Sequence, residues 1–592
     1  MRGQQAEWRS VATSPANGGA TSDSKLASDA PDVLPLLSRG DLEDILRRLP
    51  PQAIRQVLRH GVVPLAWQPD HVAYAICGPK GAGDAKRHGL PVVACIASVD
   101  FHRGVRRVWG RKIMAKATNG LSVTRPKFSA RKRVTPAQGA AFIILALFLA
   151  LSSTYVTASA LWVAASVALG LFFLSVIALR LCCLIPVPAA KTESLGNPGD
   201  ADLPTYSVLV PVFRETSVLG QLLRGLSCLN YPPEKLEIKI IVEEFDTNLR
   251  QALEKFHLPP HIEVIVVPQG SPQTKPRALN YALQFCHGSL LTIYDAEDVP
   301  EPNQLCDVVR EFSRADETLA CLQAQLTAYN PNENWLTRQF TAEYATLFGL
   351  ILPALAARRL PLTLGGTSNH FRTHILRKIG GWDPHNVTED ADLGLRLARL
   401  GFRTGVVQSL TYEEANTQLG NWLSQRARWL KGFMQTWLVH MRNPVRTASE
   451  LGPTGFWALQ ALTAGIFFSA LFHPFLIALT VWLLVFDQPH ASVATMLLAG
   501  LNLEVFVLGY GVAMLAGAKA LRQRGLRGWW LTIATMPFYG FSCPSPPGWP
   551  CGSWFSHPSS GTRPSTDYQS FRLSGRCRPC RPRVSASAEA AG

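Results

Sequence analysis

Three short stretches in the middle of this chain carry side chains that could do chemistry. Asp295-Ala296-Glu297-Asp298 follows an apolar run, Thr388-Glu389-Asp390 opens an amphipathic segment, and Gln425-Arg426-Ala427-Arg428-Trp429 precedes a long apolar segment. Closely spaced carboxylates can hold a divalent cation that also binds substrate phosphates. A carboxylate within hydrogen-bond reach of a hydroxyl can act as a general base. Arginine offers planar donors to a diphosphate, and tryptophan a face on which a sugar ring can stack.

Each stretch also has an ordinary structural interpretation. The first could be a solvated loop, because two acids three residues apart are common. Thr388 fits a helix N-cap, where the two following acids suit the positive end of the helix dipole. Arginine and tryptophan are frequent in helices that lie at a membrane interface. The order of the three stretches along the chain, rather than any one of them, favours the chemical interpretation.

The residues between 185 and 450 alternate apolar runs with helical segments, and these must position the three stretches. The expected strands are 206–212, 238–242, 263–267 and 290–294, with helices such as 218–229 and 277–285 between them. Buried strands separated by helices predict an α/β fold, a mostly parallel sheet with helices on both faces. Ligands of such sheets bind outside the carboxyl ends of the strands. Asp295 stands at the end of the fourth expected strand.

Apolar runs long enough for a bilayer, which takes about 20 residues, flank this block. They cover 137–157, 160–184, 455–487 and 493–517, and a fifth run starts near Trp529 and stops at Phe541. The third run is longer than one upright span needs, so it could begin as an interfacial helix. Arg131-Lys132-Arg133 precedes the first run, and the positive-inside rule then places the block between the spans in the cytoplasm. We therefore expect a multi-pass protein of a bacterial-type inner (plasma) membrane.

Composition divides the rest of the chain. Residues 101–133 hold many Lys and Arg and no Asp or Glu, within a net charge of +16. Attraction to anionic membrane lipid explains this segment better than nucleic acid, for which no binding module is visible. The expected divisions are 1–30, a disordered tail; 31–100, a small α/β domain; 101–136, a basic juxtamembrane linker; 137–184, a transmembrane hairpin; 185–450, the cytoplasmic α/β domain; 451–540, transmembrane helices; and 541–592, a disordered or frameshifted tail.

In combination, the three stretches resemble the processive family 2 glycosyltransferases, the cellulose synthase-like membrane group, over about residues 185–540. Lys275-Pro276-Arg277-Ala278-Leu279-Asn280 is similar to the family's K-x-x-A-L-N segment, and Pro211 to Glu215 to its P-x-x-x-E opening. Gly365 to Phe371 stands where the family has an acceptor-side loop. Residues 31–100 resemble, weakly, the N-terminal domain of type II secretion ATPases, some of which bind cyclic dinucleotides.

The resemblance implies a GT-A-like fold and an inverting transfer of a sugar from a nucleotide donor, expected to be a UDP-sugar, to a glycan or lipid acceptor, with Mg²⁺ or Mn²⁺ as cofactor. It makes Asp390 the catalytic base and Asp298 the metal-side acid. The implied donor-side residues are Glu244, Asp246, Lys275, Asp295 and Asp298. The implied diphosphate and acceptor residues are Thr388, Glu389, Gln425, Arg428 and Trp429.

The chain departs from the family pattern in three places. Val242-Glu243-Glu244-Phe245-Asp246 replaces the commoner D-D-G, which leaves the choice of nucleotide open. An R-x-x-x-R motif followed by D/N-x-S-x-x-G, the signature of cyclic-di-GMP binding in bacterial cellulose synthases, is absent from the sequence, which argues against a cellulose synthase. A reading-frame shift near residue 540 would explain the polar C-terminus. The alternative function is a non-catalytic cyclic-dinucleotide or lipid sensor on a transferase fold, although the presence of every motif acid favours an enzyme.

Overall fold

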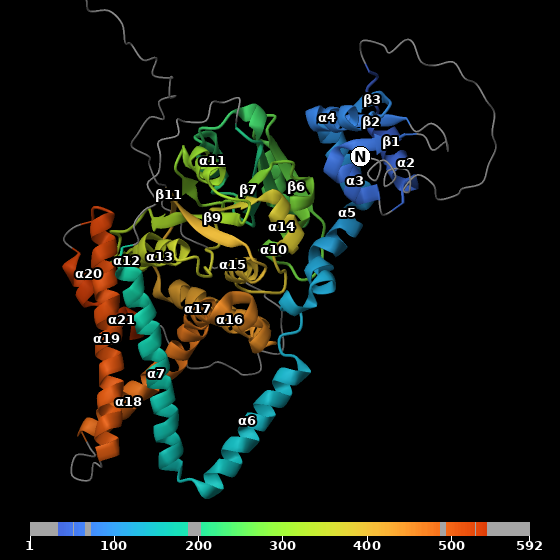
Figure 1. Ribbon diagram of the computed structural model, residues 1–592. Coiled ribbons are helices and arrows are strands. Elements are labelled where there is room, and N and C mark those ends of the chain that lie inside the picture. The colour runs from blue at the N-terminus through green and yellow to red at the C-terminus, as the bar shows by residue number, and fades with distance from the viewer. Residues whose placement is uncertain are drawn as a thin grey trace, which may run out of the picture.

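The computed structural model describes residues 34–50, 53–65, 73–186, 203–485, 493–526 and 529–541. The tails predicted at 1–30 and 541–592 lie outside these residues, apart from Phe541. Figure 1 shows a small N-terminal unit beside a central α/β unit, with long helices extending below the latter.

The N-terminal unit is a three-stranded sheet with helices. Its strands pair in the order β1-β2-β3, the first pair antiparallel and the second parallel. Its elements are α2 (Arg39–Arg48), α3 (Ala53–His60), β1 (Val62–Pro64), β2 (Tyr74–Cys77), α4 (Gly78–His88) and β3 (Val92–Ile96).

A long helix, α5 (Ser98–Thr124), occupies most of the segment predicted to be a linker, and a short turn, η1 (Pro126–Phe128), follows it. The reason is visible in the sequence, because Phe101, Val105 and Trp109 recur four residues apart and are buried. This spacing places them on one helix face. Arg103, Arg107 and Arg111 are exposed, whereas Arg106 pairs with Glu263 of the central unit at 2.6 Å. The helix packs against α2 and against α10 (Lys275–Ala282) of the central unit.

The central unit is built on an eight-stranded sheet in the order β6-β5-β4-β7-β10-β9-β11-β8. The neighbours from β6 to β7 and the pair β9–β11 are parallel, whereas β10 and β8 run antiparallel to their neighbours. The strands are β4 (Tyr206–Val212), β5 (Leu236–Glu243), β6 (Ile262–Val267), β7 (Leu290–Ile293), β8 (Val299–Pro300), β9 (Leu319–Ala328), β10 (Asn369–Arg372) and β11 (Arg403–Glu413). The predicted α/β fold with a mostly parallel sheet is confirmed.

Helices cover both faces of this sheet. Leu209 packs into one core with α5, α10, α14 and α15, whereas its neighbours Val208 and Val210 pack into a second core with α8, α9 and α11. Successive residues of a strand point to opposite faces, so one apolar strand serves both cores. The covering elements are α8 (Leu219–Ser227), η3 (Pro233–Lys235), α9 (Thr247–Glu254), α10 (Lys275–Ala282), η4 (Leu283–Phe285), α11 (Gln304–Arg314), α14 (Thr373–Ile379) and α15 (Glu389–Arg399).

A buried ion pair joins the first of these cores to the sheet, and its loss is our first prediction. Arg277 of α10 is fully buried and donates to both oxygens of Glu243 at 2.8 and 2.6 Å. Arg277→Met leaves the Glu243 carboxylate buried without its partner, which we expect to destabilise the fold by about 3–5 kcal/mol. Arg310→Met, which removes a partly exposed pair with Asp307, should cost less than about 1 kcal/mol. Equal unfolding midpoints for the two variants in urea would contradict this assignment.

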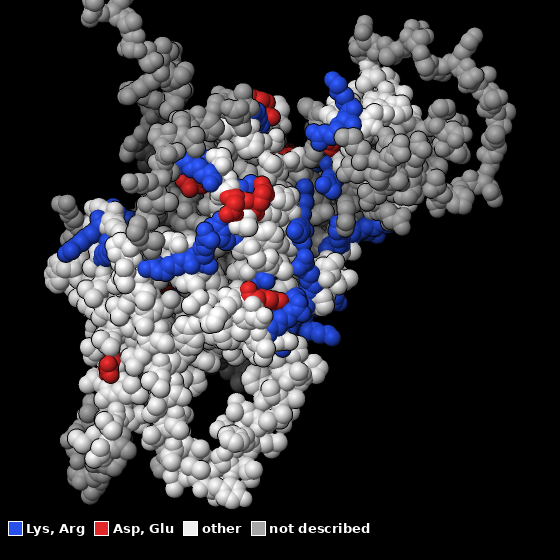
Figure 2. Space-filling model, in the orientation of Figure 1, with Lys and Arg blue, Asp and Glu red and all other residues white. Residues whose placement is uncertain are grey.

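Within the described ranges, five helices are long and apolar enough to cross a membrane, by length and composition. Four of them, α6 (Pro136–Tyr155), α7 (Ala158–Leu184), α18 (Ala464–Val485) and α19 (Val493–Gln523), fall on apolar runs predicted above. Figure 2 shows their surface on this face as almost free of charged side chains, with Lys and Arg gathered where α5 leads into α6. The long third run is divided, because α17 (Pro444–Leu462) ends before α18 begins, and α17 is itself kinked at Gly452.

The fifth candidate, Trp335–Ala357, was not predicted. It comprises α12 (Trp335–Thr346), η5 (Leu347–Ile351) and α13 (Leu352–Ala357), and 56% of its apolar window is buried, more than in the other four. It packs against α19. Gln339 and Glu343 interrupt its apolar character in the sequence, and both bond to other elements, as Gln339 does to the Thr532 carbonyl. The predicted fifth apolar run forms two short helices, α20 (Trp530–Ala534) and α21 (Met536–Phe541).

Candidate active site

Two predicted acids lie just beyond the carboxyl end of β7. The backbone N–H of Asp295 donates to Asp298 Oδ2 at 2.9 Å, and the Thr367 hydroxyl donates to the same Asp298 oxygen. Asp298 is buried. Burial, and next the negative charge of Asp295, raise the pKa of Asp298 well above its ordinary value. A buried acid cluster of this kind is the environment that a bound cation would stabilise.

Lys275, the first residue of α10, bridges Asp295 and the Gly365–Phe371 segment. Its ammonium Nζ lies 2.5 Å from Asp295 Oδ1 and donates to the Gly366 carbonyl at 2.7 Å. A Cβ at Gly366 would lie 3.4 Å from Asp390 Oδ2, which is ordinary van der Waals contact. Gly366 is therefore close to both Lys275 and Asp390, and the structure brings Asp295, Lys275 and Asp390 near one another.

The Thr388-Glu389-Asp390 stretch lies where α15 begins. Thr388 occupies the N-cap position as predicted, but its side chain makes no capping hydrogen bond within the described chain. Its hydroxyl instead bonds the Thr436 hydroxyl at 3.1 Å, because α16 (Leu419–His440) passes directly beside it. The predicted N-cap position of Thr388 is confirmed, but its hydroxyl bonds α16 and not the backbone of α15. Asp390 Oδ1 accepts from the Ala391 N–H at 2.8 Å.

Burial raises the pKa of both acids of this stretch. The pKa of Glu389 rises to about 8, first through burial and then through the charge of Asp390, while Lys275 opposes the rise. For Asp390, burial raises the pKa, whereas the Ala391 N–H and Lys275 oppose it. A carboxylate whose pKa is raised accepts a proton more readily, which suits a general base.

The raised pKa of Glu389 has a consequence for stability. The folded chain binds the proton of the Glu389 carboxyl more tightly than the unfolded chain does, because an unperturbed glutamate has a pKa of about 4.3. The free energy of unfolding should therefore fall as pH rises from 6 through 8. In EDTA, we expect the melting temperature of the wild type to fall more steeply across this range than that of Glu389→Gln. Equal dependence of the melting temperature on pH in the two proteins would contradict the raised pKa of Glu389.

The Gln425 to Trp429 stretch lies within α16. Arg426 holds Glu343 of α12 in a two-pronged pair at 2.6 and 2.5 Å, and it also donates to the Tyr539 hydroxyl at 2.8 Å. Its guanidinium lies 4.6 Å from the centroid of the Trp429 ring. Arg426 therefore ties α16 to α12 and α21. Arg426 was assigned no role from the sequence, although Trp422, four residues before it, and Trp429, three residues after it, were a signal.

The other residues predicted from this stretch lie on the same helix. Gln425 accepts from the Asn416 side chain at 3.1 Å, and Trp429 is half-buried against the apolar cluster around Phe340 and Phe348. Arg428 is exposed. The two arginines of the stretch therefore differ in exposure, since Arg426 is partly buried in its pair with Glu343 and Arg428 is exposed.

The two acids predicted after β5 have backbone partners. Glu244 accepts from the Gln269 N–H at 3.1 Å. Asp246 is buried and accepts from the N–H groups of Arg214 at 2.7 Å and Leu249 at 3.2 Å. Asp246 therefore caps α9 and fixes the turn after β4, where Arg214 has a φ of 57°.

Sequence reasoning missed Glu413, which ends β11. Burial raises the pKa of Glu413 well above its ordinary value, and the charges of Asp298, Glu297 and Asp295 add to the rise. Glu413 therefore belongs to the electrostatic environment of the β7 acids. A signal was present, because Glu413 and Glu414 follow an alternating apolar segment shortly before the Gln425 to Trp429 stretch.

The acids after β7 can supply part, but not all, of the ligand shell of a divalent cation. Within the described residues, no three His, Cys, Asp or Glu side chains form a group that could enclose a metal ion. Asp298 and Asp295 can supply one or two oxygen ligands. Mg²⁺ commonly takes one or two carboxylates and completes its shell with water and substrate phosphates. The residues present therefore fit a cation that arrives with a phosphate-bearing ligand.

Comparison with known proteins identifies a related family for the central unit. Residues 204–432 match the family model described as "Glycosyltransferase like family 2". These residues are a family 2 glycosyltransferase domain, and they include all the predicted site residues.

The individual relatives share about a quarter of their residues with this chain over the matched segments. The chain is 26% identical to a probable glycosyltransferase, YdaM, of Bacillus subtilis over 39% of this chain and 56% of that protein. It is 27% identical to the beta-monoglucosyldiacylglycerol synthase of Synechocystis over 49% of this chain and 61% of that protein. For cellulose synthase 2 of Novacetimonas hansenii, the identity is 27% over 44% of this chain and 16% of that protein. The chain thus spans about three-fifths or less of the length of these relatives.

Solved structures give remote likenesses. A mannosyltransferase of Pyrobaculum calidifontis, in complex with GDP-Man and Mn²⁺, has a TM-score of 0.39 and 17% identity, over 64% of this chain and 98% of that chain. TarS of S. aureus, in complex with UDP-GlcNAc, has a TM-score of 0.32 and 12% identity, over 57% of this chain and 92% of that chain.

Proposed function

We propose that this protein is a membrane-bound glycosyltransferase that moves a sugar from a nucleotide donor to a glycan or lipid acceptor. The observation that carries the proposal is the meeting of Asp295, Lys275 and Asp390 around the Gly366 backbone. This arrangement supports the proposal, because Asp295 follows the carboxyl end of β7, where ligands of α/β sheets bind, and Lys275 and Asp390 carry side chains that suit a phosphate and a base. The named relatives add a lipid and a glycan as acceptor classes.

The reaction we propose is a single displacement. Asp390 takes the proton from the acceptor hydroxyl, whose oxygen attacks the anomeric carbon as the bond to the nucleoside diphosphate breaks. Lys275 and Arg428 stabilise the negative charge that develops on the leaving diphosphate. Mg²⁺ or Mn²⁺, held by Asp298 and Asp295, would offset the same charge when bound. One displacement inverts the anomeric centre.

The membrane position of the site supports transfer at a cytoplasmic surface. Arg131, Lys132 and Arg133 lie just before α6, and basic residues flank membrane spans on the cytoplasmic side. We therefore place the catalytic domain in the cytoplasm, at the inner membrane of a bacterial-type cell. The alternative of a cyclic-dinucleotide sensor has no support from the family model or from the relatives named above.

The proposal is tested with membrane vesicles that contain the protein. Vesicles receive radiolabelled UDP- and GDP-sugars in turn, with Mg²⁺, with Mn²⁺ or with EDTA. We expect label from at least one donor to enter an organic extract, as glycolipid, or an ethanol precipitate, as glycan, and EDTA to suppress it. The same background label in vesicles with and without the protein, for every donor, would refute the proposal.

A further inference from the structure

One face of α16 carries residues of the Gln425 to Trp429 stretch at one end and contacts the start of α15 at the other. Gln425, Trp429, Gly432 and Thr436 recur at intervals of four, three and four residues, which places them on one side of a helix. At a rise of about 1.5 Å per residue, Gln425 and Thr436 are about 16 Å apart along the axis. A Cβ at Gly432 would lie 2.3 Å from the Thr388 methyl group, Cγ2, so the two elements touch at this glycine.

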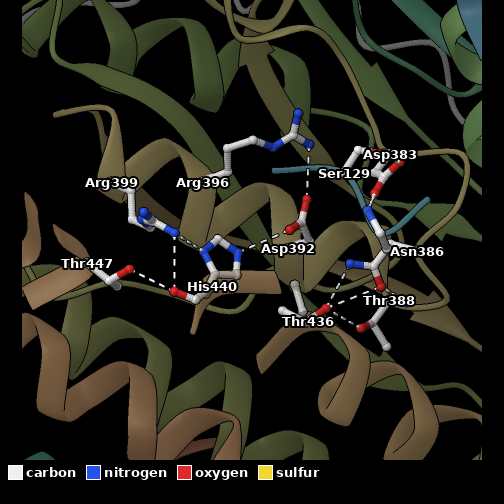
Figure 3. A network of polar contacts seen from close by, with 12 residues as sticks. Ser129, Asp383, Asn386, Thr388, Asp392, Arg396, Arg399, Thr436, His440 and Thr447 are labelled. Carbon is white, nitrogen blue, oxygen red and sulfur yellow. Dashed lines mark hydrogen bonds and ion pairs between the residues drawn. The ribbon is translucent and has the colours of Figure 1, made fainter. Parts of the chain in front are cut away.

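Beyond Gly432, two side chains of α16 hold the segment that leads into α15. Gln435 donates to the His385 carbonyl at 2.9 Å and accepts from the Val387 N–H at 3.2 Å. Thr436 accepts from the Asn386 amide at 3.0 Å, and its hydroxyl bonds that of Thr388 at 3.1 Å. Figure 3 shows Thr436 pointing at Asn386 and Thr388.

These contacts are buried and they continue into the body of α15. Asn386 and Thr436 are buried, and the Thr388 N–H donates to Asn386 Oδ1 at 3.1 Å. One turn after Thr436, His440 lies 3.1 Å from Asp392 Oδ1, with both side chains fully buried. Contacts with α16 therefore lie on both sides of Asp390 in the sequence, at Thr388 and at Asp392.

We infer that Gln435 and Thr436 are positioning residues, through which α16 sets the catalytic base against the Gln425 to Trp429 stretch. The inference rests on the proposed function, in which Asp390 is the base. The Thr388 carbonyl accepts the N–H of Asp392 at 3.0 Å as α15 begins, so a shift at Thr388 moves Asp390. A misplacement of about 1 Å can cost about a hundredfold in rate.

Thr436→Val tests the inference, because it removes the hydroxyl and keeps the shape. We expect kcat to fall about tenfold, while KM for the donor stays within about twofold, because geometry and not donor binding is lost. Thr436→Ser, which keeps the hydroxyl, should restore most of kcat. Thr447→Val is the matched control. Thr447 is equally buried in the same network, but its hydroxyl donates to the carbonyls of His440 and Asn443 instead.

Hydrogen exchange supplies a readout that does not depend on transfer. The amides of Val387 and Thr388 should exchange faster in Thr436→Val than in Thr447→Val. Unchanged exchange and unchanged kcat in Thr436→Val, beside an inactive Asp390→Asn, would overturn the inference and leave the proposed function standing. An active Asp390→Asn would instead remove the proposed function, and with it the basis of the inference.

Discussion

Asp390→Asn should lower kcat by about a thousandfold or more while the protein still folds and binds its donor. An amide has the shape of the carboxylate but cannot take a proton from the acceptor hydroxyl, and general base catalysis contributes about 10²- to 10⁴-fold. The hydrogen bond from the Ala391 N–H to Oδ1 can persist in this variant, so the start of α15 is preserved. Initial rates of transfer in vesicles, at saturating donor, measure the loss.

The control for this prediction is an acid of the same type away from the site. Asp307 lies on α11 and is partly exposed, in a pair with Arg310. Asp307→Asn should keep kcat within about twofold, because surface pairs of this kind contribute about 1 kcal/mol or less. Equal activity of Asp390→Asn, Asp307→Asn and the wild type would show that Asp390 is not the base.

The second large effect is expected at the two arginines of α16. Substitution of Arg428 should lower kcat, and substitution of Arg426 should lower stability. Arg428→Gln removes an exposed charge that we assign to the leaving diphosphate. We expect kcat to fall about 10²- to 10³-fold, with little change in melting temperature. The measurement is kcat and melting temperature on the same purified sample.

Arg426→Gln should act mainly on stability. It breaks the two-pronged pair with Glu343 and leaves that carboxylate beside the Tyr539 hydroxyl without its cation. Because Arg426 is mostly buried while Glu343 is partly exposed, we expect a loss of about 1.5–3 kcal/mol. A variant at Arg428 that loses stability but keeps kcat would contradict the division of roles between the two residues.

The parts of the fold that sequence predicts are those with uninterrupted apolar strands. The runs at 206–212 and 290–294 are β4 and β7 almost residue for residue. Strand β9 escaped prediction although it is buried along its length, because Gln323 and Gln325 break its apolar pattern. Gln323 donates to the Thr367 carbonyl at 3.0 Å, so its polarity is satisfied by a loop far away in sequence. Such a pairing cannot be read from the strand itself.

In the candidate site too, some residues could be predicted from local sequence and others depend on contacts between distant elements. Asp295 and Asp390 could be proposed because a strand end and a helix start are local features of the sequence. The contacts of Arg426 with Glu343, and of Thr388 with Thr436, join elements 83 and 48 residues apart. Their geometry depends on how α12, α15 and α16 pack. Thr388 is the N-cap residue that the sequence indicates, but the sequence gives no sign that its hydroxyl bonds Thr436 of α16.

The anomeric configuration of the product tests the central claim most directly, that Asp390 activates the acceptor for one displacement at this site. The wild type is supplied with the α-linked nucleotide sugar that it uses, and the product linkage is determined by proton NMR. We predict a β-linked product from the wild type and none above background from Asp390→Asn. An α-linked product would contradict the single displacement and the role assigned to Asp390.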